Sequence, residues 1–218
     1  MHLDAYYFAS LHLPAMTNHK EIAMIMLASP SITQKTKEKI KTDAESIFDQ
    51  IVGVTLGNDT ASKHRSGLCL YWAIATDLAC KKNDVKSELA AGTTSWKANH
   101  NAAPMPTHLT FKWEAPSPLS IVKFLQNGAL PEMHCWVKSE GHILDASCRH
   151  GKEMAEKFGL NWTECDPPQF LFEEEHEIPD GWHYKEDDGA TALAYSLAES
   201  VMLEFFRQVS IQEIELDK

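Results

Sequence analysis

Helical patterns occupy both ends of this 218-residue chain, and the strand patterns are grouped between them. Apolar residues recur every three or four positions from Ile40 to Val52 and again from Ala190 to Phe205, as on the buried face of a helix. Strands that follow one another in the middle of a chain favour an antiparallel sheet over a doubly wound parallel one. The sequence therefore predicts an α+β fold in which N-terminal and C-terminal helices flank an antiparallel sheet.

The length is that of one ordinary domain, within which three parts can be distinguished. We expect a helical N-terminal layer over residues 1–60 and a central core over residues 61–165, with a helix from about Ser66 to Lys82. Residues 166–218 are expected to form an acidic loop and a closing C-terminal helix with Asp188 as its cap. The predicted organisation is thus a single domain.

Acidic side chains outnumber basic ones by 31 to 20, which gives the chain a formal net charge of −11. Such a surface repels phosphate backbones, and no basic stripe with interleaved aromatic residues offsets this charge. No apolar run reaches the roughly 18 residues of a transmembrane helix, and the start of the chain lacks the basic segment of a secretory signal. We therefore expect a cytoplasmic protein with neither a nucleic-acid nor a membrane partner.

The chain has five cysteines, an odd number, and no Cys-x-x-Cys pair. This pattern favours reduced cytosolic thiols over a disulfide framework, and it leaves at least one thiol available for chemistry. Histidines and cysteines gather between residues 134 and 165, yet without His-Glu-x-x-His or the paired spacing of zinc modules. The sequence also lacks a glycine-rich phosphate loop, so it predicts neither a metal nor a cofactor. The cysteines are Cys69, Cys80, Cys135, Cys148 and Cys165.

Cys69 lies near the start of the predicted central helix. If Ser66 is the N-cap, Cys69 falls in the first turn, where unpaired backbone N–H groups and the helix dipole favour a negative charge. A thiol in that place is biased toward the reactive thiolate. Gly67 leaves room for another chain to approach the sulfur. The alternative is a buried structural cysteine, the usual fate of a cysteine on an apolar helix face.

His134 and Asp145 lie on two predicted strands that flank the turn Glu140-Gly141. A two-residue turn places these side chains on one face as diagonal neighbours, whereas a three-residue turn would put them on opposite faces. A nucleophilic thiol needs a neighbouring imidazole to move protons, and the imidazole needs an acceptor that orients it. The register set by a two-residue turn also places an apolar set on the other face of the hairpin, which suits the core. This set is Met133, Cys135, Val137, Leu144 and Ala146.

These segments resemble the transglutaminase-like superfamily, which belongs to the wider papain-like cysteine fold. The likeness covers about residues 60–150 and excludes the flanking helices. It implies a Cys-bearing central helix packed on an antiparallel sheet, and a triad of Cys69, His134 and Asp145. The likeness rests on Gly67-Leu68-Cys69-Leu70-Tyr71-Trp72-Ala73 at a helix start, on the strand His134-x-Trp136, and on Ile143-Leu144-Asp145-Ala146-Ser147.

The chemistry implied by this resemblance is attack of the Cys69 thiolate on an acyl carbon of a peptide, protein or small amide substrate. His134 would protonate the leaving amine and then activate water or an amine as acceptor. The oxyanion would bind the Cys69 backbone N–H and a second donor, for which His64 is the candidate. Trp72 and Trp136, on a helix and a strand respectively, are expected to wall the acyl pocket.

A second hypothesis is a catalytically silent member of the same fold that serves as a binding or interaction module. The three triad residue types are all intact in the sequence, which favours the enzyme. Hydrolysis, transamidation and acyl transfer would share the same residues, so the sequence leaves the acceptor and the acyl donor open.

Overall fold

The structure, a computed structural model, describes seven segments of the chain. By contact, the chain separates into the units Met1–Ile32 and Thr33–Lys218, and all described residues except Ile32 belong to the second unit. The described segments are residues 32–57, 68–100, 106–111, 133–148, 160–162, 170–178 and 182–216.

Three long helices are described: α2 (Gln34–Leu56), α4 (Cys69–Lys82) and α7 (Asp188–Leu216). The Thr33 side chain caps α2 by accepting a hydrogen bond from Thr36 N, and α2 ends at Gly57, whose φ of 89° suits glycine. The face predicted for this helix is confirmed, because its buried residues are Ile40, Ala44, Phe48, Ile51 and Val52. None of the helices in the described segments combines the length and apolarity that a membrane crossing requires.

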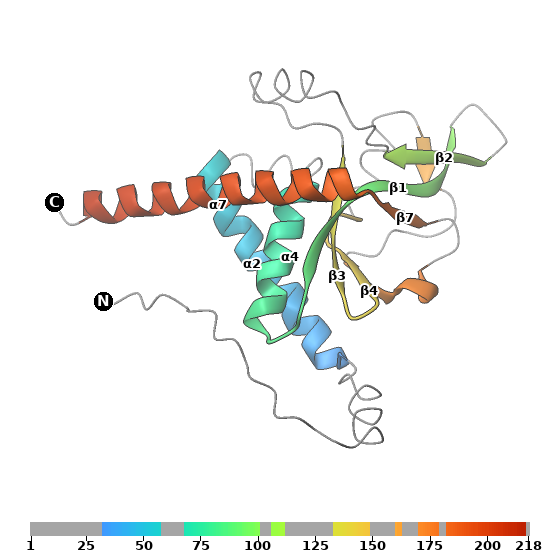
Figure 1. The fold of residues 1–218 in the computed structure, drawn as a ribbon, viewed down its shortest axis with the longest axis horizontal. Helices are drawn as coiled ribbons and strands as arrows, with labels where there is room; N and C mark the ends of the chain where they lie inside the picture. The colour runs from blue at the N-terminus through green and yellow to red at the C-terminus, as the bar shows by residue number, and fades with distance from the viewer. Residues whose placement is uncertain are drawn as a thin grey trace, which may run out of the picture. The chain divides into compact units, whose positions relative to one another are not determined.

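α4 is buried on nearly all sides, as expected of a helix that lies between two layers. It packs against α2 on one side and against the sheet on the other (Figure 1). The Phe48 ring of α2 stacks on the Trp72 ring of α4, with ring centroids 3.7 Å apart. α7 runs along β1 and also contacts α2 and α4, so it closes this side of the unit.

The sheet is antiparallel throughout its described pairs, as the sequence predicted for an α+β fold. Its main path runs β2-β1-β3-β4-β6, and the long strand β1 also pairs with β5 and β7. The strands are β1 (Glu88–His100), β2 (Pro106–Phe111), β3 (His134–Ser139), β4 (His142–Asp145), β5 (Leu160–Trp162), β6 (Leu171–Glu174) and β7 (His183–Glu186).

The β3–β4 hairpin has the two-residue turn that the sequence predicted. Ser139 pairs with His142, and Glu140 and Gly141 have φ values of 48° and 81°. Two successive positive φ values define the type I′ turn, whose twist matches that of the flanking strands. This turn fixes which side chains of the hairpin share a face.

Two predictions for the C-terminal part were wrong. The acidic segment is not all loop, because β6 and β7 lie in it and pair with β4 and β1. Both strands are only four residues long; β7 is mostly exposed, and β6 buries only Leu171 and Phe172, so neither has a long enough pattern to be distinguished from a loop. The cap of α7 is Asp187 and not Asp188, since Asp187 Oδ1 accepts from Ala190 N at 2.9 Å.

β7 lies unusually close to β1 at Gly92. A Cβ atom at Gly92 would lie 2.2 Å from the Lys185 carbonyl oxygen, so only glycine permits this approach. After β7, side chains of α7 also hydrogen-bond to β1. Thr191 Oγ1 accepts from Ala91 N and the Tyr195 hydroxyl accepts from Leu89 N, both at 3.0 Å. The segment that contains β7 is therefore held firmly against β1.

Candidate active site

Cys69 is the first residue of α4, at the end of the helix that lies against the start of β3. The N-cap is Leu68, so the predicted cap at Ser66 was wrong; Ser66, Gly67 and His64 lie outside the described residues. Leu68 has no side-chain acceptor, and none of the side chains that the structure describes caps this helix end. The first-turn N–H groups of α4 therefore remain available to an anion.

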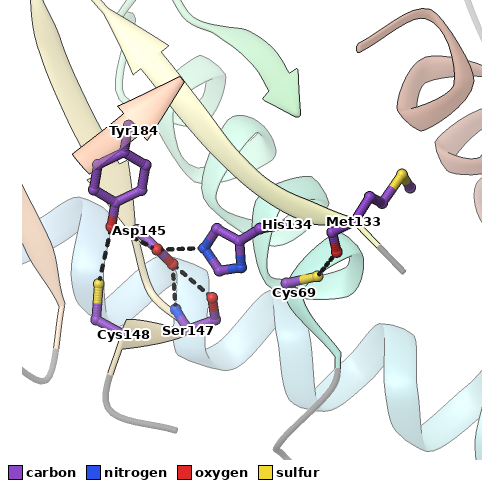
Figure 2. A network of polar contacts seen from close by, with 7 residues as sticks. All are labelled: Cys69, Met133, His134, Asp145, Ser147, Cys148 and Tyr184. Atoms are coloured by element: carbon purple, nitrogen blue, oxygen red, sulfur yellow. Dashed lines mark hydrogen bonds and ion pairs between the residues drawn. The ribbon is translucent and has the colours of Figure 1, made fainter. Parts of the chain in front are cut away.

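The Cys69 sulfur is half-buried and lies beside the first residues of β3. The thiol donates to the Met133 carbonyl oxygen at 3.4 Å. The sulfur is also near enough to the His134 imidazole for each group to shift the pKa of the other. Figure 2 shows the imidazole between the sulfur of Cys69 and the carboxylate of Asp145. A helix start and a strand start thus bring the thiol and the imidazole together.

His134 and Asp145 form a short buried contact on the same face of the hairpin. His134 Nε2 lies 2.7 Å from Asp145 Oδ2, and the two side chains are 8% and 3% exposed. Because Nε2 is turned to the carboxylate, Nδ1 is the ring nitrogen turned to Cys69. The structure therefore brings together the three residues that the sequence assigned to one site.

The Asp145 carboxylate accepts further hydrogen bonds. Ser147 donates to Oδ1 from its backbone N at 2.8 Å and from its hydroxyl at 2.6 Å. Tyr184, on β7, donates its hydroxyl to Oδ2 at 2.8 Å. A buried carboxylate stays charged when it has donors of this kind and a cationic partner.

The charges of the pair stabilise each other. Burial alone would lower the pKa of His134, but the charge and hydrogen bond of Asp145 outweigh it and raise this pKa to about 10. Burial acts to raise the pKa of Asp145, yet the charge of His134 and the hydrogen bonds from His134, Ser147 and Tyr184 lower it to about 2. At neutral pH the site therefore contains an imidazolium and a carboxylate.

The pKa of the Cys69 thiol lies well below its ordinary value. A hydrogen bond from the Cys135 thiol lowers it, burial opposes this, and the hydrogen bond and charge of His134 lower it further. Cys135 itself has a raised pKa because of its hydrogen bond with Cys69 and its burial. Cys69 is the member of this pair that ionises, because it adjoins the imidazolium and the start of α4.

The other described cysteines are inert by comparison. Burial and the nearby Asp77 raise the pKa of Cys80 to about 12. Burial and the Asp145 charge raise the pKa of Cys148 well above its ordinary value. Chemistry at a thiolate is therefore directed to Cys69 within the described segments.

The two tryptophans expected at the acyl pocket occupy different positions. Trp72 is 1% exposed and stacks on Phe48 between α2 and α4, so it has a packing role there. Trp136 is also 1% exposed, but its ring lies 6.1 Å from that of His134 and 5.2 Å from that of Tyr184. The Trp136 ring therefore packs against the imidazole.

Sequence reasoning missed Tyr184 and gave no role to Ser147. The local signal for Tyr184 is the short alternation of Trp182, His183 and Tyr184, which fits a half-buried strand but does not say which strand it joins. Ser147 lies two residues after Asp145, which is the spacing at which an Asp side chain accepts from the backbone in a turn. In the described segments, no three His, Cys, Asp or Glu side chains are arranged to hold a metal ion.

The comparisons with known proteins leave the family open. Scans against protein-family models and against curated proteins give no match. A search of solved structures finds a crystal structure titled only as a genomics target. It has 14% sequence identity and a TM-score of 0.43, and the match covers 78% of this chain and 77% of that chain. A likeness at this level says nothing about function, so the functional argument rests on the geometry of the site.

Proposed function

We propose that this protein is a cysteine-dependent amide hydrolase or acyltransferase that acts through a thioester on Cys69. The observation that carries the proposal is the position of His134, whose imidazole lies between the Cys69 sulfur and the buried Asp145 carboxylate and is 2.7 Å from the carboxylate. A thiol, a base and an acceptor that orients the base are the parts that nucleophilic acyl transfer needs.

In the first half-reaction, the Cys69 thiolate attacks the acyl carbon of the substrate. The oxyanion that develops is stabilised by the Cys69 backbone N–H at the start of α4, where no side chain of the described segments competes for the first-turn donors. The imidazolium of His134 then gives its proton to the leaving amine as the carbon–nitrogen bond breaks. A thioester on Cys69 and a neutral imidazole remain.

In the second half-reaction, His134 takes a proton from the acceptor, which is water for hydrolysis or an amine for transamidation. The acceptor attacks the thioester carbon, the carbon–sulfur bond breaks, and the thiolate and imidazolium are restored. Asp145 keeps its charge throughout and holds the imidazole in one orientation. The substrate class is an amide or acyl group of a peptide, a protein or a small molecule.

The arrangement of the elements supports a transglutaminase-like fold as part of this proposal. A helix that starts at the cysteine packs on an antiparallel sheet, and successive strands supply the histidine and then the aspartate. The cysteines in the described segments are all free thiols, which fits a cytoplasmic location.

The alternative is a catalytically silent fold that binds a partner. One observation favours it: the Cys69 thiol donates to the Met133 carbonyl, a contact that stabilises the neutral thiol. The imidazolium contact must outweigh this bond for the thiolate to form. The two functions therefore differ in whether Cys69 accepts an acyl group.

The test is acylation of the whole chain by p-nitrophenyl acetate, followed by mass spectrometry. We expect one acetyl group on Cys69 that neutral hydroxylamine removes, as it does from a thioester. Cys69→Ala should abolish this labelling, whereas the matched variant Cys80→Ala should retain it, because Cys80 is fully buried. Equal labelling of wild type and Cys69→Ala would contradict the proposal and favour the silent fold.

A further inference from the structure

We infer that Tyr184 is a positioning residue of this site, which holds the Asp145 carboxylate in the orientation that His134 requires. The inference rests on the proposed function. The Tyr184 hydroxyl donates to Asp145 Oδ2 at 2.8 Å, and the same oxygen lies 2.7 Å from His134 Nε2. Figure 2 shows both contacts converging on one end of the carboxylate.

Ser147 cannot perform this task, although it makes two hydrogen bonds to the same carboxylate. It lies two residues from Asp145, in the same turn, and its bonds go to Oδ1, the oxygen away from His134. Ser147 therefore moves together with Asp145 and fixes the side chain only relative to its own turn. A donor from another part of the fold is needed to fix Oδ2 relative to the imidazole.

Tyr184 is such a donor, because β1 anchors both it and His134. On β1, Gly92 pairs with His134 of β3, and Thr94 two residues later pairs with Tyr184 of β7. The missing side chain at Gly92 allows β7 to approach, and Asp187 N donates to Ala91 O at 3.0 Å where β7 ends. The imidazole and the phenol are thus placed from the same stretch of one strand.

The phenol is held as a donor. Burial, and then the charge of Asp145, raise the pKa of Tyr184 well above its ordinary value, so the hydroxyl keeps its proton. Cys148 Sγ lies 3.4 Å from the hydroxyl oxygen and, as a buried thiol, can donate to it. The ring packs edge-on against Trp136, which fixes its plane. Within the described residues, the titratable groups that face this network are Cys69, Cys135, His134, Asp145, Cys148 and Tyr184 itself.

The experiment compares the pH dependence of Cys69 alkylation by iodoacetamide in wild type and Tyr184→Phe, followed by mass spectrometry of the intact chain. Without the phenol, the carboxylate holds the imidazolium less well, and the thiolate loses part of its stabilisation. We expect the acid limb of the rate profile to move to higher pH by about one unit, a roughly tenfold slower reaction on that limb. A purely structural role would lower the melting temperature and leave the limb in place.

Two further chains serve as controls. Tyr195→Phe also removes a tyrosine hydroxyl, but one on α7 that accepts from Leu89 N, and it should leave the acid limb unchanged. Replacement of Tyr184 by 4-aminophenylalanine keeps the ring and a weaker N–H donor, and it should shift the limb in the same direction by less. If Tyr184→Phe fails to fold, the pH profile of the 4-aminophenylalanine variant is compared with that of wild type instead.

The outcomes separate this inference from the proposed function. One outcome would overturn the role of Tyr184 alone. In it, wild-type Cys69 is alkylated rapidly and His134→Gln slows the reaction, but no substitution at Tyr184 moves the acid limb. Slow, ordinary alkylation of Cys69 in wild type would overturn the proposed function, whatever the Tyr184 variants do.

Discussion

His134 Nε2 and Asp145 Oδ2 lie 2.7 Å apart although the two residues are not opposite each other in the hairpin. The register pairs Val137 with Leu144, which sets Asp145 across from Trp136 and makes His134 its diagonal neighbour. Diagonal neighbours on one face are within reach of long side chains. The contact therefore depends on a turn of two residues at Glu140 and Gly141.

One prediction follows from the turn. Insertion of one glycine between Glu140 and Gly141 should slip the register and move Asp145 to the face opposite His134. We expect Cys69 to lose its preference over the other cysteines in alkylation by iodoacetamide. The control is Glu140→Asn, which keeps the two-residue turn and suits a φ of 48°. Its alkylation should match wild type. An insertion variant that folds and alkylates as fast as wild type would show that the register is unimportant for reactivity.

Asp145→Asn should slow alkylation of Cys69 strongly without a large change in shape. The amide offers His134 no charge and favours the wrong imidazole tautomer, and in a comparable triad this change costs about four orders of magnitude in rate. We expect a loss of at least about a hundredfold at neutral pH, where Asp145 is fully ionised given its pKa of about 2. Asp43→Asn, which removes the carboxylate paired with Lys82, is the matched control and should react normally. If the two variants are alkylated at comparable rates, Asp145 does not contribute to the reactivity of Cys69.

Gly92→Ala should destabilise the fold, because the added Cβ would lie 2.2 Å from the Lys185 carbonyl oxygen and β7 would have to move. Overpacking of this kind costs about 1–3 kcal/mol in the free energy of unfolding, measured by urea denaturation. Gly141→Ala is the comparison, since its φ of 81° is strained for alanine but no atom lies within 4 Å of the added Cβ. That variant should lose only about 1–2 kcal/mol and keep the reactivity of Cys69. If Gly92→Ala is as stable as wild type, the close approach of β7 to β1 is incorrect.

Trp72→Phe distinguishes packing from substrate contact. The smaller ring leaves part of the stack on Phe48 unfilled, so we expect a loss of about 1–3 kcal/mol in unfolding free energy. The rate at which p-nitrophenyl acetate acylates Cys69, per folded molecule, should stay at the wild-type value. Phe48→Leu, on the other side of the same stack, should behave alike. A selective loss of acylation in Trp72→Phe would restore this residue to the acyl pocket.

The parts of the fold that the sequence could predict are those encoded by local patterns. The buried face of α2 follows from apolar spacing between Ile40 and Val52, and the hairpin register follows from a turn that only two residues fill. Both signals act over short stretches of chain. They are sufficient to predict that His134 and Asp145 share one face.

The parts that it could not predict depend on contacts between distant segments. β7 pairs with β1 across about ninety residues of chain, and a strand of four mostly exposed residues carries little pattern of its own. Tyr184 was missed for this reason. The position of Trp72 also depends on contacts between distant segments. One face of α4 contacts α2 and the other contacts β3, and the spacing of apolar residues does not say which face Trp72 joins.

The most direct test of the central claim is a titration of the Cys69 thiolate by its ultraviolet absorbance, taken as the difference between wild type and Cys69→Ala. Because the pKa of Cys69 is lowered, the thiolate is present above that value and disappears only as the pH falls through it. We predict absorbance that persists far below the ordinary pKa of a thiol, and that is lost at neutral pH when His134→Gln is introduced into both chains. A Cys69 that titrates as an ordinary thiol, with or without His134, would contradict the account.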